Sequence, residues 1–320
     1  MLRPRRTIFA VICGIAFVLA VPIPISFPWS TDPEVDQSNT GALSDYYRKA
    51  YSSGAESKGT NSQSEFAPLS AKEQYYIDYA RTAATLNRIP ERVAEFVAKY
   101  HLKDKKVLEV GAGSGLLQDL ADDYTGLDIS PTAQRFFHKP FVIASATEMP
   151  FQANSFDALW SVWVLEHIPN PEKALLEMRR VVKPGGYIYL LPAYEVGRYQ
   201  AQGYRVRPYS DFDVSGKIVK ATIPIADSRI YHYLQAHQIR LLRFFGARLV
   251  SDPSRFHYIR LTPNYEQYWD YDSDATTSFS HYELYLWFSS RGDHILDSPS
   301  EFQLIFRDHD FRALVLQVSK

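Results

Sequence analysis

Cysteine is almost absent from this sequence. The one cysteine among 320 residues is Cys13, within an apolar run near the N-terminus. A single thiol excludes an intrachain disulfide and a thiolate metal cluster, and it leaves the redox compartment open. The nine histidines show no H-E-x-x-H or similar ligand spacing, so the sequence does not support a metal site.

An excess of either charge is also missing. Lysine and arginine total 35 against 36 aspartates and glutamates, for a formal net charge of −1. Nucleic-acid binding usually needs a clearly basic face, so this balance argues against a nucleic-acid partner. With 46% hydrophobic residues, the chain is long enough for one α/β domain with appendages.

The N-terminus carries the longest apolar run. Three arginines precede residues 8–21, which are all apolar, and prolines interrupt the continuation to residue 27. Residues 8–27 are long enough to cross a bilayer, whereas the unbroken part has the length of a signal-peptide core. We therefore expect residues 1–29 to be a membrane anchor or signal-like segment, with one N-terminal span. No cleavage site is evident. The serine-rich residues 30–70 are expected to form a flexible linker.

The next part of the chain alternates between strand and helix patterns. Helices are expected at 70–86 and 90–100, and again at 116–123, 134–138 and 172–182. Apolar strands are expected at 107–110, 124–129, 141–144, 156–161 and 187–191. Strands joined by helical crossovers predict an α/β fold: a Rossmann-like, mostly parallel sheet with helices on both faces.

After Pro192 the regular alternation ends. We expect residues 71–320 to form one domain in which about 193–275 is an irregular cap or insertion, with one helix around 228–245. A helix is expected at 282–290. Residues 302–306 and 313–318 are expected to form a closing antiparallel strand pair.

A glycine-rich turn follows the first expected strand. In open α/β sheets, ligands bind beyond the carboxyl ends of the strands. The turn Gly111-Ala112-Gly113-Ser114-Gly115 lies there. Glycines allow close approach of a ligand, and a helix opening at the turn would present free N–H groups. Asp128 ends the second strand, where a carboxylate can accept both hydroxyls of a ribose.

The residues around this turn discriminate between nucleotides. The dinucleotide fingerprint is G-x-G-x-x-G, and here Gly115 comes one residue early. Glu109 would repel a diphosphate, whereas it would attract the cationic groups of S-adenosylmethionine (AdoMet). The sequence therefore favours AdoMet as the cofactor over NAD.

Five segments in order resemble a known family: VLEVGAGSG, GLDIS, SATEMPF, SFDALWSVWVLEHIPNP and LLEMRRVVKPGGYIYLLP. They are similar to the class I, Rossmann-like, AdoMet-dependent methyltransferases. The most similar subgroup is the type 11 small-molecule set that includes the quinone-biosynthesis C-methyltransferases. The resemblance covers about residues 90–192 and implies methyl transfer (EC 2.1.1.-).

The resemblance implies a set of cofactor-binding residues. The methionine end of AdoMet would be held by Glu109, Gly111, Ala112, Gly113 and Gly115. The ribose would bind Asp128, the adenine would lie against Ile129, Ala146 and Thr147, and the methyl end would be lined by Ser161 and Val162. Ser145 stands where the family often has an acidic residue, so the usual hydrogen bond to the adenine amino group is in doubt.

Methyl transfer from a sulfonium needs positioning and at most one deprotonation. His167 is the candidate catalytic base; it could instead satisfy the backbone of its loop, and both interpretations stay open. The Asn/Asp-Pro-Pro-aromatic motif of base-modifying methyltransferases is absent after the fourth strand, which argues against nucleic-acid adenine as the acceptor.

Three hypotheses remain. The first is a methyltransferase acting on a small-molecule acceptor, which the apolar N-terminus suggests is lipid or quinone-like. The second is a catalytically silent, membrane-tethered binding or assembly protein with the same fold. The third, an NAD-dependent oxidoreductase, is disfavoured by Glu109 and Gly115. The acceptor atom and the oligomeric state do not follow from the sequence.

The side of the membrane also stays open. The arginines precede the apolar run and acidic residues follow it, so the positive-inside rule would place the main domain on the non-cytoplasmic side. AdoMet is a cytosolic cofactor in most settings. Either the span inserts against its charge bias, or it lies at the interface, or the compartment imports AdoMet.

Overall fold

The structure, a computed structural model, describes residues 71–226, 228, 240–246, 254–263, 272–296, 301–306 and 312–320. The expected N-terminal anchor, the linker and most of the helix expected at 228–245 lie outside these residues. Among the described helices, none has the length and apolar character needed to cross a bilayer.

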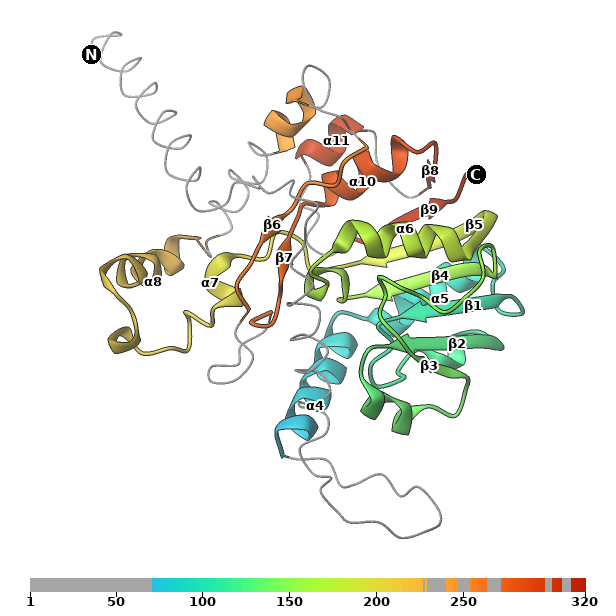
Figure 1. Ribbon diagram of the computed structural model, residues 1–320, viewed down its shortest axis with the longest axis horizontal. Coiled ribbons are helices and arrows are strands. Elements are labelled where there is room, and N and C mark those ends of the chain that lie inside the picture. Colours follow the sequence, from blue (N-terminus) through green and yellow to red (C-terminus); the bar gives the residue numbers. More distant parts are fainter. Residues whose placement is uncertain are drawn as a thin grey trace, which may run out of the picture. The chain divides into compact units, whose positions relative to one another are not determined.

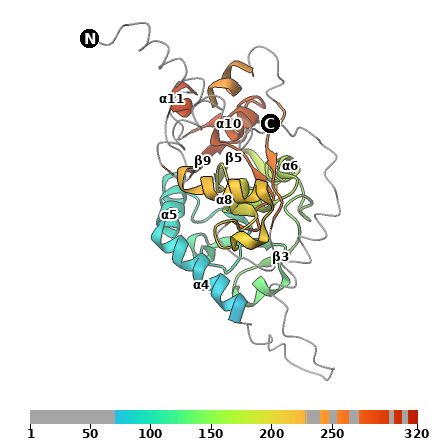
Figure 2. The same ribbon diagram turned by 90° about the vertical axis from the view of Figure 1, so that its left-hand side faces the viewer.

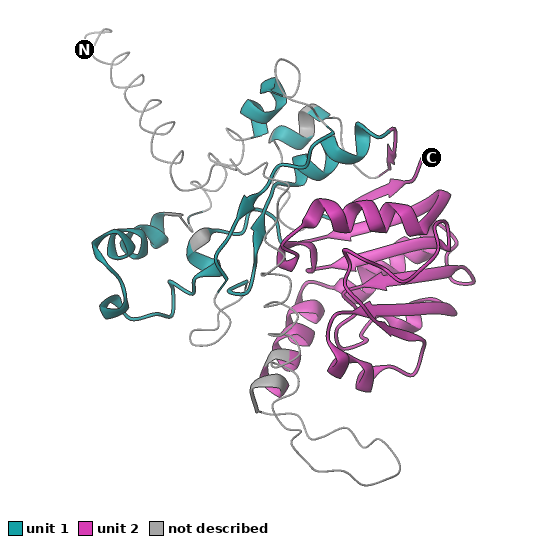
Figure 3. Cartoon of the chain, viewed as in Figure 1, with its two compact units in different colours: residues 1–33, 193–291, 298–312 teal, residues 34–192, 292–297, 313–320 magenta. Residues whose placement is uncertain are grey.

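The chain divides into two compact units (Figure 3). Unit 1 comprises residues 1–33, 193–291 and 298–312, and unit 2 comprises residues 34–192, 292–297 and 313–320.

Unit 2 is built on a seven-stranded sheet with the order β3-β2-β1-β4-β5-β9-β8 (Figure 1). The strands from β3 to β5 pair in parallel, and β9 pairs antiparallel with β5 and β8. The α/β fold with a mostly parallel sheet is therefore confirmed. The strands are β1 (Lys106–Val110), β2 (Asp123–Asp128), β3 (Phe141–Ile143), β4 (Phe156–Val162), β5 (Val182–Leu191), β8 (His294–Ile295) and β9 (Leu314–Gln317).

Helices cover both faces of this sheet. Helix α5 (Ile89–Lys99) and helix α6 (Pro171–Val181) lie on opposite sides of it (Figures 1 and 2). α5 follows α4 (Ala71–Leu86) and buries a stripe that includes Val93, Phe96 and Val97; such spacing gives one apolar helix face. α6 begins where Asn170 accepts a hydrogen bond from the Lys173 amide at 3.0 Å, a side-chain N-cap.

Two expected α-helices are 3-10 helices in the structure. Within residues 116–123 the helical part is η1 (Gln118–Leu120), and near the helix expected at 134–138 lies η2 (Pro131–Phe136). The Gln118 side chain donates to the carbonyls of Gly115 and Phe136, both at 3.0 Å. These bonds hold the segment in a compact turn where an α-helix was expected.

The prediction of a closing strand pair is wrong for the first strand, residues 302–306. Residues 301–306 form helix α11 (Glu301–Phe306), which buries Leu304 and Ile305, and β9 pairs with β8 instead. A short apolar run fits a buried helix as well as a strand, because its periodicity cannot separate the two.

Unit 1 contains short elements and small cores. The strands β6 (Ile259–Arg260) and β7 (Thr277–Ser278) form an antiparallel pair, and α10 (His281–Ser289) begins with a Ser280 cap. Two ion pairs connect the helical residues 240–246 to other segments: Arg240 with Glu195 at 3.0 Å, and Arg243 with Glu283 at 2.5 Å. Other helices in the described part of this unit are α7 (Arg198–Ala201), the 3-10 helix η4 (Tyr209–Asp211) and α8 (Val214–Ala226).

Candidate AdoMet site

The glycine turn after β1 is held in an unusual backbone conformation. Gly111, Gly113 and Gly115 have φ angles of 73°, 48° and 69°, in the left-handed region that favours glycine. The amides of Gly111 and Ala112 both donate to the Leu127 carbonyl, at 2.8 and 3.0 Å. These bonds fix the turn against the end of β2.

The three glycines differ in the space around them. A Cβ added to Gly111 would lie 2.1 Å from Val164 Cγ2, so glycine is needed there for packing. A Cβ on Gly113 would meet nothing within 4 Å. The backbone of Gly113 therefore borders open space. A ligand that approaches the main chain needs such a position.

Asp128 connects the turn to the end of β2. Its Oδ2 accepts from the Gly113 amide at 2.8 Å, and its Oδ1 accepts from the Ser130 amide at 2.9 Å. Burial raises the pKa of this carboxyl, and the backbone donors oppose that shift. A carboxylate has about four acceptor positions, and the amides of Gly113, Ser130 and Ile129 all lower the pKa of Asp128, so the side chain keeps at least one position for a further donor.

Glu109 lies in β1 and is 5% exposed. The Tyr124 hydroxyl donates to Glu109 Oε2 at 2.5 Å. Burial raises the pKa of Glu109 to about 8, the hydrogen bond from Tyr124 lowers it, and the charge of Asp128 adds to the rise. The carboxyl therefore holds its proton at neutral pH, and a cation beside it would favour the ionised form.

The loop after β3 approaches the same region. The Ala144 amide donates to the Asp128 carbonyl at 3.0 Å. In the next residues, Ser145 Oγ and Thr147 Oγ1 are 2.9 Å apart, and the Thr147 amide donates to Ser145 Oγ at 3.2 Å. Ser145 thus orders the loop that carries Ala146 and Thr147, which are both partly buried, as is Ile129 after Asp128.

The end of β4 completes this edge of the sheet. Ser161 is 3% exposed and Val162 is partly buried. Because β1 and β4 are parallel, with Glu109 opposite Trp160, Ser161 and Val162 lie at the carboxyl edge where the glycine turn begins. The predicted cofactor residues of β1, β2 and β4 therefore share one sheet edge.

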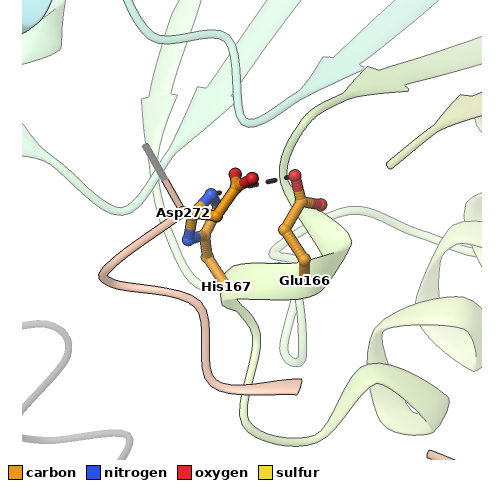
Figure 4. Close-up of side chains that lie close together, drawn as sticks. All are labelled: Glu166, His167 and Asp272. Atoms are coloured by element: carbon orange, nitrogen blue, oxygen red, sulfur yellow. Dashed lines mark ion pairs between the residues drawn. The ribbon is translucent and has the colours of Figure 1, made fainter. Parts of the chain in front are cut away.

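His167 lies in the 3-10 turn η3 (Leu165–His167), which also carries Glu166 (Figure 4). Glu166 is fully buried, and its Oε1 lies 3.8 Å from His167 Nε2. The His167 amide donates to the Val164 carbonyl at 3.0 Å. This backbone bond does not involve the imidazole, so the role of the His167 side chain stays a prediction.

Sequence reasoning missed three contributors to this site. Tyr124 and Ser130 donate to the carboxyl groups of Glu109 and Asp128 respectively, and Glu166 lies beside His167. A signal existed for Glu166, because its neighbours Leu165 and Ile168 are apolar and a short turn between them is expected to be buried. Tyr124 has no comparable signal, since its partner lies on another strand.

The geometry thus brings the glycine turn and the Asp128 carboxyl together at one edge of a Rossmann-like, mostly parallel sheet. Residues 108–190 match the family described as "Methyltransferase domain", Methyltransf_11. These residues thus match an AdoMet-dependent methyltransferase domain of the type 11 group, and AdoMet is the cofactor of such a domain.

Curated relatives agree with this assignment. The chain is 29% identical over 170 residues to the ubiquinone/menaquinone biosynthesis C-methyltransferase of Cupriavidus taiwanensis, which covers 46% of this chain and 68% of the relative. It is 33% identical over 94 residues to the sterol 4-C-methyltransferase of Caenorhabditis elegans, covering 25% and 28%. The chain spans less than half the length of several curated relatives that it matches.

Among solved structures, an AdoMet-dependent methyltransferase from Aquifex aeolicus matches with a TM-score of 0.32 at 19% identity, covering 38% of this chain and 72% of that one.

Proposed function

We propose that this protein is an AdoMet-dependent methyltransferase that methylates a small, lipophilic acceptor. The observation that carries the proposal is the bond from the Gly113 amide to Asp128, because it joins the open glycine turn to the carboxylate suited to a ribose. The names of the relatives, which include a sterol and a quinone-biosynthesis methyltransferase, support a lipophilic acceptor.

In this proposal, the residues of unit 2 bind and orient, and AdoMet supplies an activated methyl group when bound. Asp128 accepts the ribose hydroxyls, and Gly113 allows the methionine end to approach the backbone. Glu109 gives up its proton and stabilises the positive charge of the ligand. Ile129, Ala146 and Thr147 border the adenine, while Ser161 and Val162 line the methyl end.

His167 is proposed as the base that removes a proton from the acceptor where the reaction requires it. The buried Glu166 carboxylate, 3.8 Å from Nε2, would favour the protonated imidazolium that forms in that step. This role applies to an acceptor hydroxyl or amine that becomes more acidic as the methyl group is transferred.

Two further parts of the proposal concern the remainder of the chain. Residues 8–27 anchor the protein to a membrane, which would bring it close to a lipophilic acceptor. Residues 193–275 form the cap that selects this acceptor, since the methyl-transfer segments end at residue 192.

Calorimetry on the purified full chain in detergent tests the cofactor site. Wild-type protein should bind S-adenosylhomocysteine, and Asp128→Ala should lose this binding. Asp123→Ala is the matched control, because Asp123 is exposed at the opposite end of the same strand. Binding of NADH in place of S-adenosylhomocysteine would contradict the proposal and favour an oxidoreductase.

Labelled AdoMet, supplied together with the lipid fraction or the water-soluble fraction of a cell extract, tests turnover. A labelled product in the lipid fraction supports a lipophilic acceptor, and labelling restricted to water-soluble compounds contradicts that part. Binding of S-adenosylhomocysteine with no transfer to either fraction would favour the silent, membrane-tethered hypothesis.

A further inference from the structure

The Tyr124 hydroxyl reaches Glu109 by lying along strand β2. Tyr124 is the register partner of Val107 in β1, and Gly126, two residues further along β2, is the partner of Glu109. Residues two apart in a strand face the same side of the sheet, so the Tyr124 ring passes over Gly126 to meet the Glu109 carboxyl. A Cβ added to Gly126 would lie 3.2 Å from the Tyr124 hydroxyl oxygen. Glycine at this position therefore leaves the space that the contact needs.

The Tyr124 ring is fixed by its aromatic neighbours. It stacks on Phe137, with ring centroids 6.4 Å apart, and is tilted against Trp160 at 5.9 Å. Tyr124 is 1% exposed. Burial raises the pKa of Tyr124 well above its ordinary value, and the carboxyl groups of Glu109, Asp128 and Asp119 add to the rise. The hydroxyl therefore keeps its proton and stays a donor.

Two neutral side chains and one acidic one face Glu109. Tyr124 donates to it from β2 at 2.5 Å, and Trp160 is its register partner in β4. Burial raises the pKa of Glu109 to about 8, Tyr124 and Trp160 lower it, and the charge of Asp128 raises it. None of these three side chains is basic. The two donors suit the ionised carboxylate, and a ligand cation would supply the charge that favours this form.

We propose that Tyr124 is a positioning residue for the cofactor: its hydroxyl holds the Glu109 carboxyl in both charge states, so that the cationic end of AdoMet binds as Glu109 releases a proton to the solvent. Glu109 contacts the ligand, and Tyr124 acts through Glu109. This inference rests on the proposed function and adds to it a dependence of cofactor binding on pH that Tyr124 sets.

Calorimetry with S-adenosylhomocysteine on the full chain in detergent, from pH 6 to pH 9, tests this role. The ligand keeps the ammonium group of AdoMet and is bound without a methyl acceptor. With the pKa of Glu109 at about 8, wild-type affinity should rise about 50-fold from pH 6 to pH 8, since only the ionised carboxylate attracts the ligand. Close to one proton should be released at pH 7, measured in buffers of different ionisation enthalpy. Whatever affinity Glu109→Gln keeps should show neither effect.

Tyr124→Phe keeps the aromatic ring and removes only the hydroxyl. Without this donor the ionised Glu109 carboxylate is less stable, so the rise in affinity should move to higher pH by about one unit. The variant should bind about tenfold more weakly than wild type at pH 7 but only about twofold more weakly at pH 9. Comparison with wild type at each pH removes the titration of the ligand itself.

Tyr187→Phe is the matched control. Tyr187 lies in β5 of the same sheet, and its ring stacks on Tyr100 at 4.6 Å. This variant should follow the wild-type affinity at each pH. Circular dichroism checks that every variant is folded.

Two outcomes would overturn the inference while the proposed function stands. A constant ratio between Tyr124→Phe and wild type from pH 6 to pH 9 would show that the hydroxyl serves packing alone. Wild-type affinity that stays level from pH 6 to pH 8 would show that Glu109 is ionised before the ligand arrives. Failure of wild type to bind S-adenosylhomocysteine at any pH would contradict both the inference and the proposed function.

Discussion

The Glu109 carboxyl group is buried, and its hydrogen-bond partner is the buried Tyr124 hydroxyl. The Tyr124 hydroxyl occupies one carboxyl oxygen, and burial makes the ionised form costly in the free protein. The family resemblance implies that this residue holds the cationic end of AdoMet. Because Glu109 is protonated when no cation lies beside it, the stability of the folded protein should depend on pH through this residue.

We predict that Glu109→Gln flattens the pH dependence of stability. Burial raises the pKa of Glu109 from 4.5 to about 8 in the folded protein, so folding favours the protonated form. That contribution is fully present below pH 4.5 and is lost as the pH rises through about 8. The glutamine variant should therefore be more stable than wild type at pH 8, by on the order of a few kcal/mol.

Urea denaturation from pH 4.5 to pH 9 measures this effect. Glu148→Gln, at an exposed glutamate of the same unit, is the control and should follow the wild-type curve. Parallel curves for Glu109→Gln and wild type across this range would show that Glu109 titrates normally.

At the scale of the element, two glycines of the same turn serve different purposes: Gly111 is needed for packing, and Gly113 is proposed to border the ligand. Gly111 faces Val164, whereas Gly113 faces open space, although both have left-handed backbone. Alanine at either position meets the same backbone strain, about 1–2 kcal/mol, but only one of them meets a side chain.

We therefore predict that Gly111→Ala and Gly113→Ala fail in different ways. Gly111→Ala should destabilise the protein by about 3 kcal/mol or more, because strain and overpacking add. Gly113→Ala should cost about 1–2 kcal/mol in stability and weaken S-adenosylhomocysteine binding roughly 10–100-fold, because its methyl group enters the ligand space. Thermal denaturation and calorimetry measure the two effects, and equal binding by Gly113→Ala and wild type would place the ligand elsewhere.

The end of the sheet is held by a buried ion pair. Arg179 of α6 donates to Asp293 at 2.8 and 3.2 Å and also to the Ser319 carbonyl, and the Asp293 side chain is fully buried. Arg179→Ala would leave the buried Asp293 carboxylate without this cation, so we expect a loss of about 3–5 kcal/mol.

Lys183→Ala is the matched control, because its pair with Asp157 is 44% and 30% exposed and should contribute less than about 1 kcal/mol. Denaturation of both variants at neutral pH provides the comparison. Equal losses would contradict the assigned difference in burial.

Residues whose positions depend on local spacing could be placed from the sequence. The glycine turn, Asp128 and Glu109 lie at fixed distances from strand ends, so the parallel sheet brings them to one edge. Tyr124 could not be predicted, because its bond to Glu109 depends on the register between β1 and β2. The strand predicted at residues 302–306 was wrong for a different reason. Their short apolar run fits either a strand or a buried helix, and tertiary packing decides which of the two forms.

At the scale of the whole molecule, the two units should respond differently to the cofactor product. The residues proposed to bind the cofactor all belong to unit 2. A ligand that binds only the folded state stabilises it by about 2.7 kcal/mol at 100 times its dissociation constant. S-adenosylhomocysteine should therefore slow amide exchange in β1 and β2, and leave β6 and β7 of unit 1 unchanged.

Hydrogen exchange with mass spectrometry measures this difference, with Asp128→Ala protein as the control that should gain no protection. Protection of β6 and β7 to the same degree would show that the units unfold together. Unchanged exchange in β1 and β2 would contradict the assigned site.

The position of β9 in the sheet has a consequence for biosynthesis. β5 ends at residue 191, yet its antiparallel partner begins at residue 314, so all of residues 193–291 must leave the ribosome before the sheet of unit 2 can close. Until then, β5 exposes an unpaired edge to which other chains can add. Destabilising substitutions in unit 1 are therefore expected to lower the yield of folded unit 2 in the cell, because an unfolded unit 1 delays the pairing of β9 with β5. Once the sheet has closed, the residues proposed to bind the cofactor should be unaffected.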